Sequence, residues 1–189
     1  MTYFVIVIAY ILGNFTTSYI VGKLMGNIDI RKHGSGNAGS TNVFRTLGKK
    51  AGALAFAGDA LKGVLAVYLG MLVGGQILAM VCGVVVVIGH NWPVVLKFKG
   101  GKGMATSIGV GLMLYPIPAS ICIIFAVALI AIFKMVSLGS VVSMALLPFA
   151  LIIFEDRNAV IFGAILGTMA IYRHKANIYR IFKGVERKI

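Results

Sequence analysis

Long runs of apolar residues, separated by short polar segments, dominate the sequence. The clearest runs extend from Thr2 to Val21, from Ala51 to Val73 and from Ile77 through Val95. Each approaches or exceeds the roughly 18 apolar residues that are needed to cross a hydrocarbon core of about 30 Å. A single soluble core could not bury all of these runs. The pattern therefore predicts an all-α integral membrane protein.

Glycines, prolines and charge clusters divide the chain into about seven predicted transmembrane helices. The fourth is too short to span a membrane alone at about 1.5 Å rise per residue, and Pro116 and Pro118 separate it from the fifth. We find no internal repeat and expect one polytopic membrane domain over residues 1–189. The predicted helices cover residues 2–24, 50–73, 76–96, 103–114, 117–133, 137–154 and 158–173.

Composition and charge give the expected orientation. Hydrophobic residues make up 59% of the chain and charged residues only 12%, yet the net charge is +13. Most Lys and Arg lie in loops 25–49 and 97–102, at Lys134 and in the tail from Arg173, whereas the opposite turns hold only Arg157. Because positively charged loops stay in the cytoplasm, we expect the N-terminus outside and the C-terminus inside. Basic residues at the ends of apolar helices indicate anionic lipids or phosphorylated substrates, and not nucleic acid.

Two charged residues, Asp59 and Lys62, lie within a hydrophobic run. Their i, i+3 spacing places them on one helix face, where they can pair. A structural ion pair near the membrane interface is the favoured interpretation, and a substrate contact is the alternative.

The most unusual polar segment extends from Gly34 to Arg45. Its glycines permit the positive φ angles that turn consecutive backbone N–H groups inward. Residues 40 to 42, Ser-Thr-Asn, can cap a short helix that ends at Gly48. The segment predicts an anion-binding loop to which Arg45 adds a charged donor. The alternative is a flexible Gly/Ser loop.

A second glycine-rich segment, Gly100-Gly101-Lys102-Gly103, opens the fourth predicted helix. Backbone donors, the helix dipole and the Lys102 charge together suit a phosphate. The Walker A pattern cannot be written over this segment. Membrane topology alone explains the neighbouring Lys97 and Lys99 equally well, so this loop by itself leaves both interpretations open.

Two further motifs are candidates. Ser137 and Ser140 begin the sixth predicted helix, where Ser137 could serve only as an N-cap. His174 and Asn177, at the end of the last helix, are i, i+3 neighbours that could orient a hydroxyl or donate to an oxyanion. A polybasic tail that binds acidic lipids would explain the surrounding Lys and Arg, but not this pair.

Missing motifs narrow the chemistry. With three scattered histidines, five carboxylates and no His-Glu-x-x-His pattern, a catalytic metal site is not expected. No Gly-x-Ser-x-Gly segment indicates a serine acyl-enzyme. None of the histidines is followed five positions later by Asp, which argues against acyltransferases that use a His-x4-Asp pair.

Together the motifs resemble the signature blocks of the bacterial acyl-phosphate:glycerol-3-phosphate acyltransferase family, PlsY. They occur in the family's order, and the similarity extends over essentially the whole chain. The blocks are Ser35 to Arg45, Gly89-His90 with Pro93, Phe98 to Gly103, Ser137 with Ser140, and Arg173 to Ile178.

The resemblance implies transfer of a fatty acyl group from acyl phosphate to the 1-hydroxyl of sn-glycerol 3-phosphate. The products would be lysophosphatidic acid and phosphate, in phospholipid biosynthesis. It also implies seven helices in the bacterial cytoplasmic (inner) membrane, with the active site open to the cytoplasm and with no metal, acyl-CoA or other cofactor. The expected partners are the two substrates and membrane lipid, without nucleic acid.

Carried onto this sequence, the resemblance gives catalytic roles to Ser35, Lys102, His174 and Asn177. Either glycine-rich loop could bind either phosphate, and a substrate phosphate could accept the proton. A small anion transporter and a lipid-binding scaffold are the rival interpretations, although transporters usually show repeats and midplane sites. The expected substrate-binding residues are Gly36, Asn37, Ser40, Thr41, Asn42, Arg45, His90, Gly100, Gly101, Gly103, Ser137 and Ser140.

Overall fold

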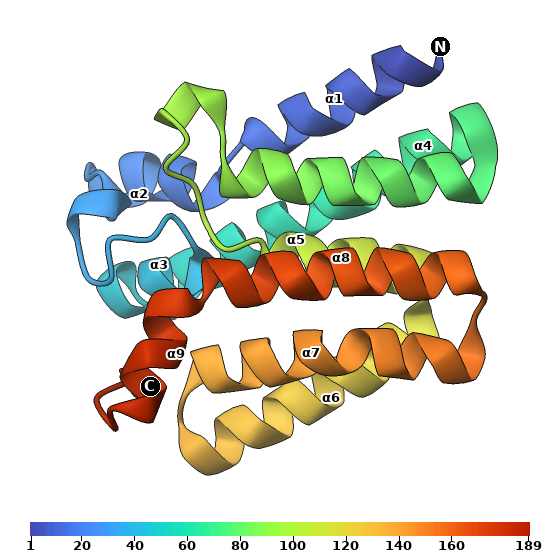
Figure 1. The fold of residues 1–189 in the computed structure, drawn as a ribbon. Helices are drawn as coiled ribbons and strands as arrows, with labels where there is room; N and C mark the ends of the chain where they lie inside the picture. Colours follow the sequence, from blue (N-terminus) through green and yellow to red (C-terminus); the bar gives the residue numbers. More distant parts are fainter. The chain divides into compact units, whose positions relative to one another are not determined.

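The computed structural model describes residues 1–189 and contains helices but no strand, as predicted. The chain forms two compact units, Met1–Leu114 and Tyr115–Ile189. Figure 1 shows the helices in order along the chain: α1 (Thr2–Asn14), α2 (Thr17–Gly26), η1 (Ile30–Lys32), α3 (Ser40–Leu47), α4 (Lys49–Asn91), η2 (Val94–Leu96), α5 (Met104–Leu114), α6 (Pro116–Phe133), α7 (Val136–Phe154), α8 (Arg157–Arg173) and α9 (Lys175–Phe182).

Helix α4 organises the first unit and reverses direction near its middle. It packs against α1, α2, α3 and α5. Gly74 and Gly75 have non-helical backbone angles, and Gly75 has a φ of +70°, which favours glycine. A Cβ on Gly70 would lie 2.7 Å from the Cα of Ala79, so the two halves of α4 contact each other. The boundary predicted between residues 73 and 76 is therefore confirmed.

The first apolar segment is interrupted, contrary to the prediction of one helix over residues 2–24. Helix α1 ends at Asn14 and α2 begins at Thr17. Lys62 of α4 donates to the carbonyls of Gly13 (3.1 Å) and Phe15 (2.8 Å). Because these carbonyls are satisfied by a side chain of another helix, the break costs little even in an apolar environment.

The helix predicted over residues 76–96 also ends earlier than expected. Helix α4 stops at Asn91, and the prediction of helix to residue 96 is wrong for the final residues. Pro93 lacks the N–H that a continued helix requires, and residues 94–96 form a separate 3-10 turn.

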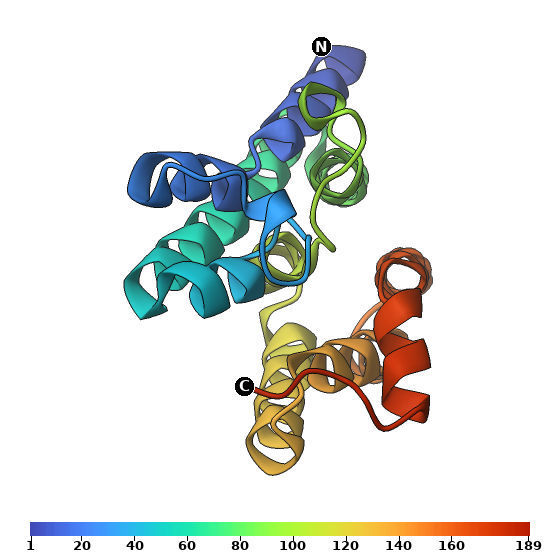
Figure 2. The same ribbon diagram turned by 90° about the vertical axis from the view of Figure 1, so that its left-hand side faces the viewer.

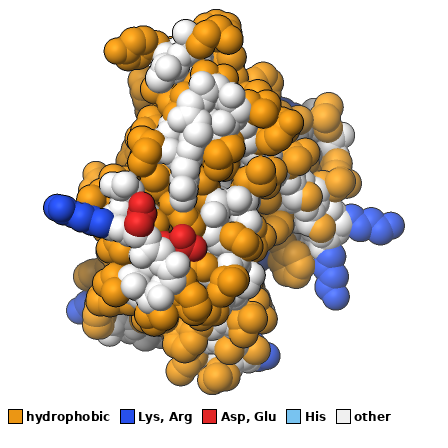
Figure 3. Space-filling view, turned by 90° about the vertical axis from the view of Figure 1, so that its right-hand side faces the viewer, with side chains coloured by type: hydrophobic (Ala, Val, Ile, Leu, Met, Phe, Trp, Pro, Cys, Tyr) orange, Lys and Arg blue, Asp and Glu red, His pale blue; other side chains and the backbone are white.

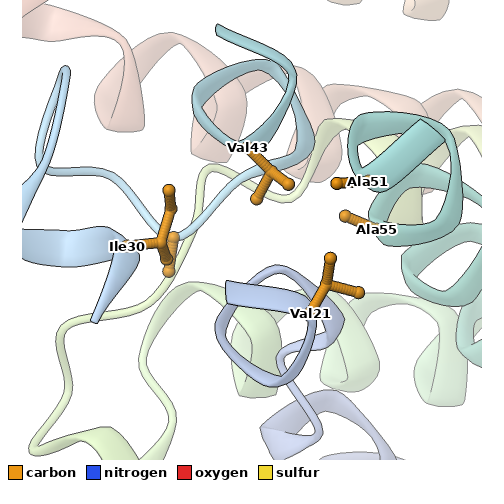
Figure 4. Close-up of a cluster of buried hydrophobic side chains, with 6 residues drawn as sticks. Val21, Ile30, Val43, Ala51 and Ala55 are labelled. Atoms are coloured by element: carbon orange, nitrogen blue, oxygen red, sulfur yellow. The ribbon is translucent and has the colours of Figure 1, made fainter. Parts of the chain in front are cut away.

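A small apolar cluster supports the segment between α2 and α4. Figure 4 shows side chains of α2, η1, α3 and the start of α4 pointing toward one another. All are buried, so the loop that carries residues 33–39 is attached to a packed base and is not a free linker. The cluster consists of Val21, Ile30, Ala38, Val43, Ala51 and Ala55.

In the second unit, α7 packs against both α6 and α8, and α9 contacts α7 and α8. A Cβ on Gly139 or Gly167 would lie 2.7 Å from the Ala126 carbonyl or 2.6 Å from the Met144 carbonyl, so these glycines let the helices approach closely. Figure 2 shows the tail after α9 running back toward the start of α7. There the N–H of Ile189 donates to the carbonyl of Lys134 at 2.8 Å.

The surface is that of an integral membrane protein. Hydrophobic side chains cover most of the face in Figure 3. Large apolar side chains are exposed on several helices, for example Ile117, Ile124 and Val127 on α6. Large exposed apolar areas require a lipid environment. The stretches long and apolar enough to cross a membrane are Thr2–Gly26, Lys49–Leu96, Pro116–Phe133 and Val136–Phe154, and α5 is a shorter apolar helix.

Candidate functional site

Asn42 shapes the first glycine-rich loop. Its side-chain amide donates to the carbonyls of Ile30, His33 and Asn37, each at 3.0 Å. Its Oδ1 accepts from the N–H of Ser35 at 2.9 Å, and the residue is only 2% exposed. One buried amide thus supplies the hydrogen bonds that this irregular segment lacks. Asn42, predicted to bind substrate, has its side chain occupied by the loop itself.

The glycines of this loop have the predicted backbone angles at two positions. Gly34 has a φ of +58° and Gly36 a φ of +73°. A Cβ on Gly34 would also collide with Oδ1 of Asn42, so the tight loop excludes any side chain there. Gly39, by contrast, is extended, with a φ of −133°, and precedes α3. The loop is therefore a fixed turn, and the flexible alternative is not supported.

Helix α3 follows the loop and ends at Leu47, with Gly48 after it, as predicted. Its N-cap is Gly39, and no side chain caps the first turn, so the predicted capping by residues 40–42 is wrong. The reason is that Asn42 turns back to the loop carbonyls. A helix start without a capping side chain leaves its N–H groups available to an anion. Ser35, in the loop before α3, is exposed, and Ser40 and Thr41 in the first turn are half-buried. Arg45 is exposed in the last turn of α3.

The second glycine-rich loop folds against His90. The N–H of Gly101 donates to the His90 carbonyl at 3.1 Å. A Cβ on Gly100 would collide with that carbonyl, and one on Gly101 would collide with the Nε2 atom of His90. Close approach to His90 therefore requires the Gly-Gly pair, a steric reason that sequence reasoning missed. Gly103 has a φ of +78°, and Lys102 is half-buried.

The two glycine-rich loops lie next to each other within the first unit. A Cβ on Gly101 would lie 2.8 Å from the carbonyl of Ala38. Arg31, which sequence analysis did not single out, connects η1 to η2 by donating a hydrogen bond to the Leu96 carbonyl at 3.1 Å. Its guanidinium also pairs with Asp29 at 2.8 Å, and its hydrogen bond lowers the pKa of Asp29 to about 2. Arg31 is therefore charged and oriented.

The predicted ion pair is present and is part of a larger buried group. Lys62 Nζ lies 2.9 Å from Asp59 Oδ1 and 2.8 Å from His90 Nδ1. Asp59 accepts from the N–H of Thr17 at 3.2 Å and from the hydroxyl of Ser18 at 3.3 Å. Asp59, Lys62 and His90 are each at most 5% exposed. A buried pair needs such additional hydrogen bonds, because its mutual attraction alone does not offset desolvation.

In the second unit, three polar side chains converge on Glu186. Ser137 donates to the carboxylate at 2.9 Å, Asn177 at 2.6 Å and Arg180 at 2.7 Å. Burial alone would raise the pKa of Glu186, but these hydrogen bonds outweigh it and hold the pKa below its ordinary value. Ser137 is thus a partner of Glu186 and not an N-cap, which is Met135. Nothing in local sequence spacing links residue 186 to residue 137.

His174 lies at the junction of α8 and α9 and is 3% exposed. Its Nδ1 lies 2.7 Å from the carbonyl of Ala170. A carbonyl only accepts, so Nδ1 carries the proton and Nε2 of the neutral ring is an acceptor. Asn177 follows one turn later and is also buried, and so is Ser140 on α7. The predicted His–Asn pair therefore lies on one side of the α8–α9 junction.

The fold and these residues define an all-helical integral membrane protein whose glycine loops and buried polar side chains lie at helix ends. The model of the family described as glycerol-3-phosphate acyltransferase matches residues 3–184. The chain belongs to this family, of the PlsY type, and is a membrane-embedded acyltransferase of phospholipid biosynthesis.

Relatives match over nearly their full length. Glycerol-3-phosphate acyltransferases of Alkaliphilus metalliredigens and Clostridioides difficile are 56% and 50% identical, over 98% and 97% of this chain and 94% and 93% of their own. Crystal structures of PlsY, an integral membrane glycerol 3-phosphate acyltransferase, match with TM-scores of 0.94 for the glycerol 3-phosphate form and 0.92 for the lysophosphatidic acid form. Both are 34% identical and cover 100% of this chain and 95% of the other.

Proposed function

We propose that the enzyme transfers a fatty acyl group from acyl phosphate to the sn-1 hydroxyl of glycerol 3-phosphate. The hydroxyl oxygen attacks the acyl carbon, the bond from that carbon to the phosphate oxygen breaks, and lysophosphatidic acid and inorganic phosphate form. Nε2 of His174 assists removal of the hydroxyl proton, which ends on the departing phosphate. Acyl phosphate is already an activated acyl donor, so we propose that neither a metal nor a cofactor takes part.

The observation that carries this proposal is the pair of adjacent glycine-rich loops in the first unit. Both loops lead directly into a helix start, at α3 and at α5, where the helix dipole favours an anion. Arg45 and Lys102 would supply the two positive charges. Two phosphorylated substrates need two such positions, and the related PlsY structures are described with glycerol 3-phosphate and with lysophosphatidic acid.

We propose that His174 and Asn177 handle the reacting hydroxyl. With Nδ1 bound to the Ala170 carbonyl, Nε2 of His174 is the ring atom that can accept from the glycerol hydroxyl. The Asn177 amide is oriented by its donation to Glu186, so its oxygen faces away from that carboxylate. Ser35 would donate to substrate phosphate from the first loop, and Ser140 would line the site.

We further propose a seven-span topology in one polytopic domain, with the N-terminus outside and the glycine-rich loops facing the cytoplasm. Helix α4 has 43 residues, about 65 Å at 1.5 Å per residue, which is twice the hydrocarbon thickness. The reversal at Gly74 and Gly75 fits two spans. Single cysteines at Gln76 and Lys49, labelled with an impermeant reagent on intact bacterial cells, test this, because only the first should react.

The direct test is an activity assay of purified protein with palmitoyl phosphate, glycerol 3-phosphate and a chelator. Lysophosphatidic acid and phosphate should form in equal amounts. Flux of phosphate across proteoliposomes without acyl product would favour a transporter, and binding without product would favour a scaffold. Either result would overturn the proposed reaction.

Arg45→Ala should raise the KM for one phosphorylated substrate about 10- to 100-fold, because a charged hydrogen bond contributes about 1.5–3 kcal/mol. Lys102→Ala should raise the KM for the other substrate more than it raises the KM for the substrate that Arg45→Ala affects. Steady-state kinetics with each substrate varied in turn measures both, and Arg187→Ala in the exposed tail is the matched control. Unchanged KM values in both variants would contradict the assignment of these cations.

Glu186→Gln should make the protein less stable at pH 7 and flatten its response to acid. Since the folded pKa of Glu186 is lowered, its stabilisation is complete above the ordinary glutamate value and is lost as the pH falls through the folded value. Thermal unfolding in detergent between about pH 3 and 7 measures this. Glu155→Gln, at an exposed position, is the control. Parallel pH curves for Glu186→Gln and wild type would contradict the expected linkage.

A further inference from the structure

His90 lies where the buried charged group meets the two glycine-rich loops. Its ring contacts Lys62 through Nδ1 at 2.8 Å, and its carbonyl accepts from Gly101 at 3.1 Å. The residue is 3% exposed. It is therefore almost fully enclosed, with Lys62 on one side and the second glycine-rich loop on the other.

The neighbours of Lys62 determine the proton position on His90. The Lys62 ammonium faces the carbonyls of Gly13 and Phe15 and the carboxylate of Asp59, three groups that accept hydrogen bonds. The charged ammonium shares its three N–H groups among these acceptors and Nδ1 of His90. An N–H on Nδ1 of His90 would then point at another donor. Asp59 Oδ1 lies 3.5 Å from Nδ1, at the limit of a hydrogen bond and farther than Lys62 Nζ at 2.8 Å.

Nε2 of His90 lies on the opposite edge of the ring, against the loops. A Cβ added to Gly101 would meet that Nε2 and would lie 2.8 Å from the Ala38 carbonyl. Gly101 of the second loop therefore lies next to both the His90 ring and the Ala38 carbonyl of the first loop. With Nδ1 accepting from Lys62, the neutral ring carries its proton on Nε2, on the side of these loops.

We propose that His90 is a positioning residue, held by Lys62 as the neutral tautomer with its proton on Nε2, which keeps the two glycine-rich loops in register. Asp59 and Lys62 act on the site through His90 without touching substrate. This inference rests on the proposed function, since His90 would hold both loops in the arrangement that binds the phosphorylated substrates. Binding sites work only when such supporting contacts fix their geometry.

Nitrogen-15 NMR of histidine-labelled protein in detergent tests the tautomer without any activity. The difference between wild type and His90→Asn assigns the His90 signals. We expect an unprotonated Nδ1 and a protonated Nε2 from about pH 6 to 8, across the ordinary histidine range. In Asp59→Asn/Lys62→Met the fixed tautomer should be lost. A protonated Nδ1 in wild type, as the other tautomer or as imidazolium, would overturn the proposal.

Kinetics tests the positioning role with two variants of His90. Asn retains an oxygen near the Nδ1 position for Lys62 but cannot reach the loops, whereas Gln places its amide near Nε2. His90→Asn should raise the KM of a phosphorylated substrate about tenfold with kcat changed less than about threefold, and His90→Gln should restore most of that loss. Equal effects of Asn and Gln would refute the positioning role. An inactive wild type would overturn the proposed function, and the NMR result would still decide the tautomer.

Discussion

His174→Ala is expected to lower kcat about 100- to 10,000-fold while the KM for glycerol 3-phosphate changes little. A positioned group that assists proton transfer contributes on this scale, and only in the transition state. The Ala170 carbonyl fixes the ring so that Nε2 is the acceptor. Single-turnover and steady-state rates of lysophosphatidic acid formation measure the change.

The control for this variant is His33→Ala, which removes an exposed histidine of the first unit. It should retain turnover close to wild type. If His174→Ala instead raised only the KM, the ring would bind substrate without assisting the attack. The hydroxyl would then be activated by the substrate phosphate alone.

Lys62→Met is expected to give the largest loss of stability, about 3–5 kcal/mol. The change leaves the Asp59 carboxylate buried without its cation, which costs far more than the net contribution of the pair. It also leaves the carbonyls of Gly13 and Phe15 without a donor. Thermal or denaturant unfolding in detergent, together with the yield of folded protein, measures the effect.

The double variant Asp59→Asn/Lys62→Met should recover part of this loss, because it removes the unpaired charge. Recovery should be incomplete, since the carbonyls at the end of α1 remain unsatisfied. Lys49→Met, at the exposed start of α4, is the matched control and should change stability little. If Lys62→Met were as stable as Lys49→Met, the buried pair would not be needed for stability.

Hydropathy and charge predicted the helical membrane fold and most helix boundaries, because these depend on local composition. The reversal of α4 was foreseeable from Gly74 and Gly75 for the same reason. The break between α1 and α2 was not. The local signal is a short polar stretch, Asn14 and Thr16 to Ser18, which hydropathy averaged over the long apolar run conceals. The groups that stabilise the break come from α4, more than 40 residues later.

The parts of the candidate site that are formed by residues close in sequence were predictable, and the contacts between distant segments were not. Spacing identified the Asp59–Lys62 pair, since both lie on one helix face, but not His90, which is 28 residues from Lys62. Residue types likewise suggested Asn42 as a ligand, whereas its amide is used to close the loop. Glu186 was missed because its partners Ser137 and Asn177 come from two other helices.

The interruption at Phe15 has a consequence for how the protein is made. The N-terminal segment leaves the ribosome first, but the side chains that complete its hydrogen bonding belong to residues 59 and 62. Inside a bilayer its exposed peptide groups would be unfavourable until then. We therefore expect this segment to wait at the translocon, or near the lipid headgroups, until α4 has been synthesised and can insert beside it.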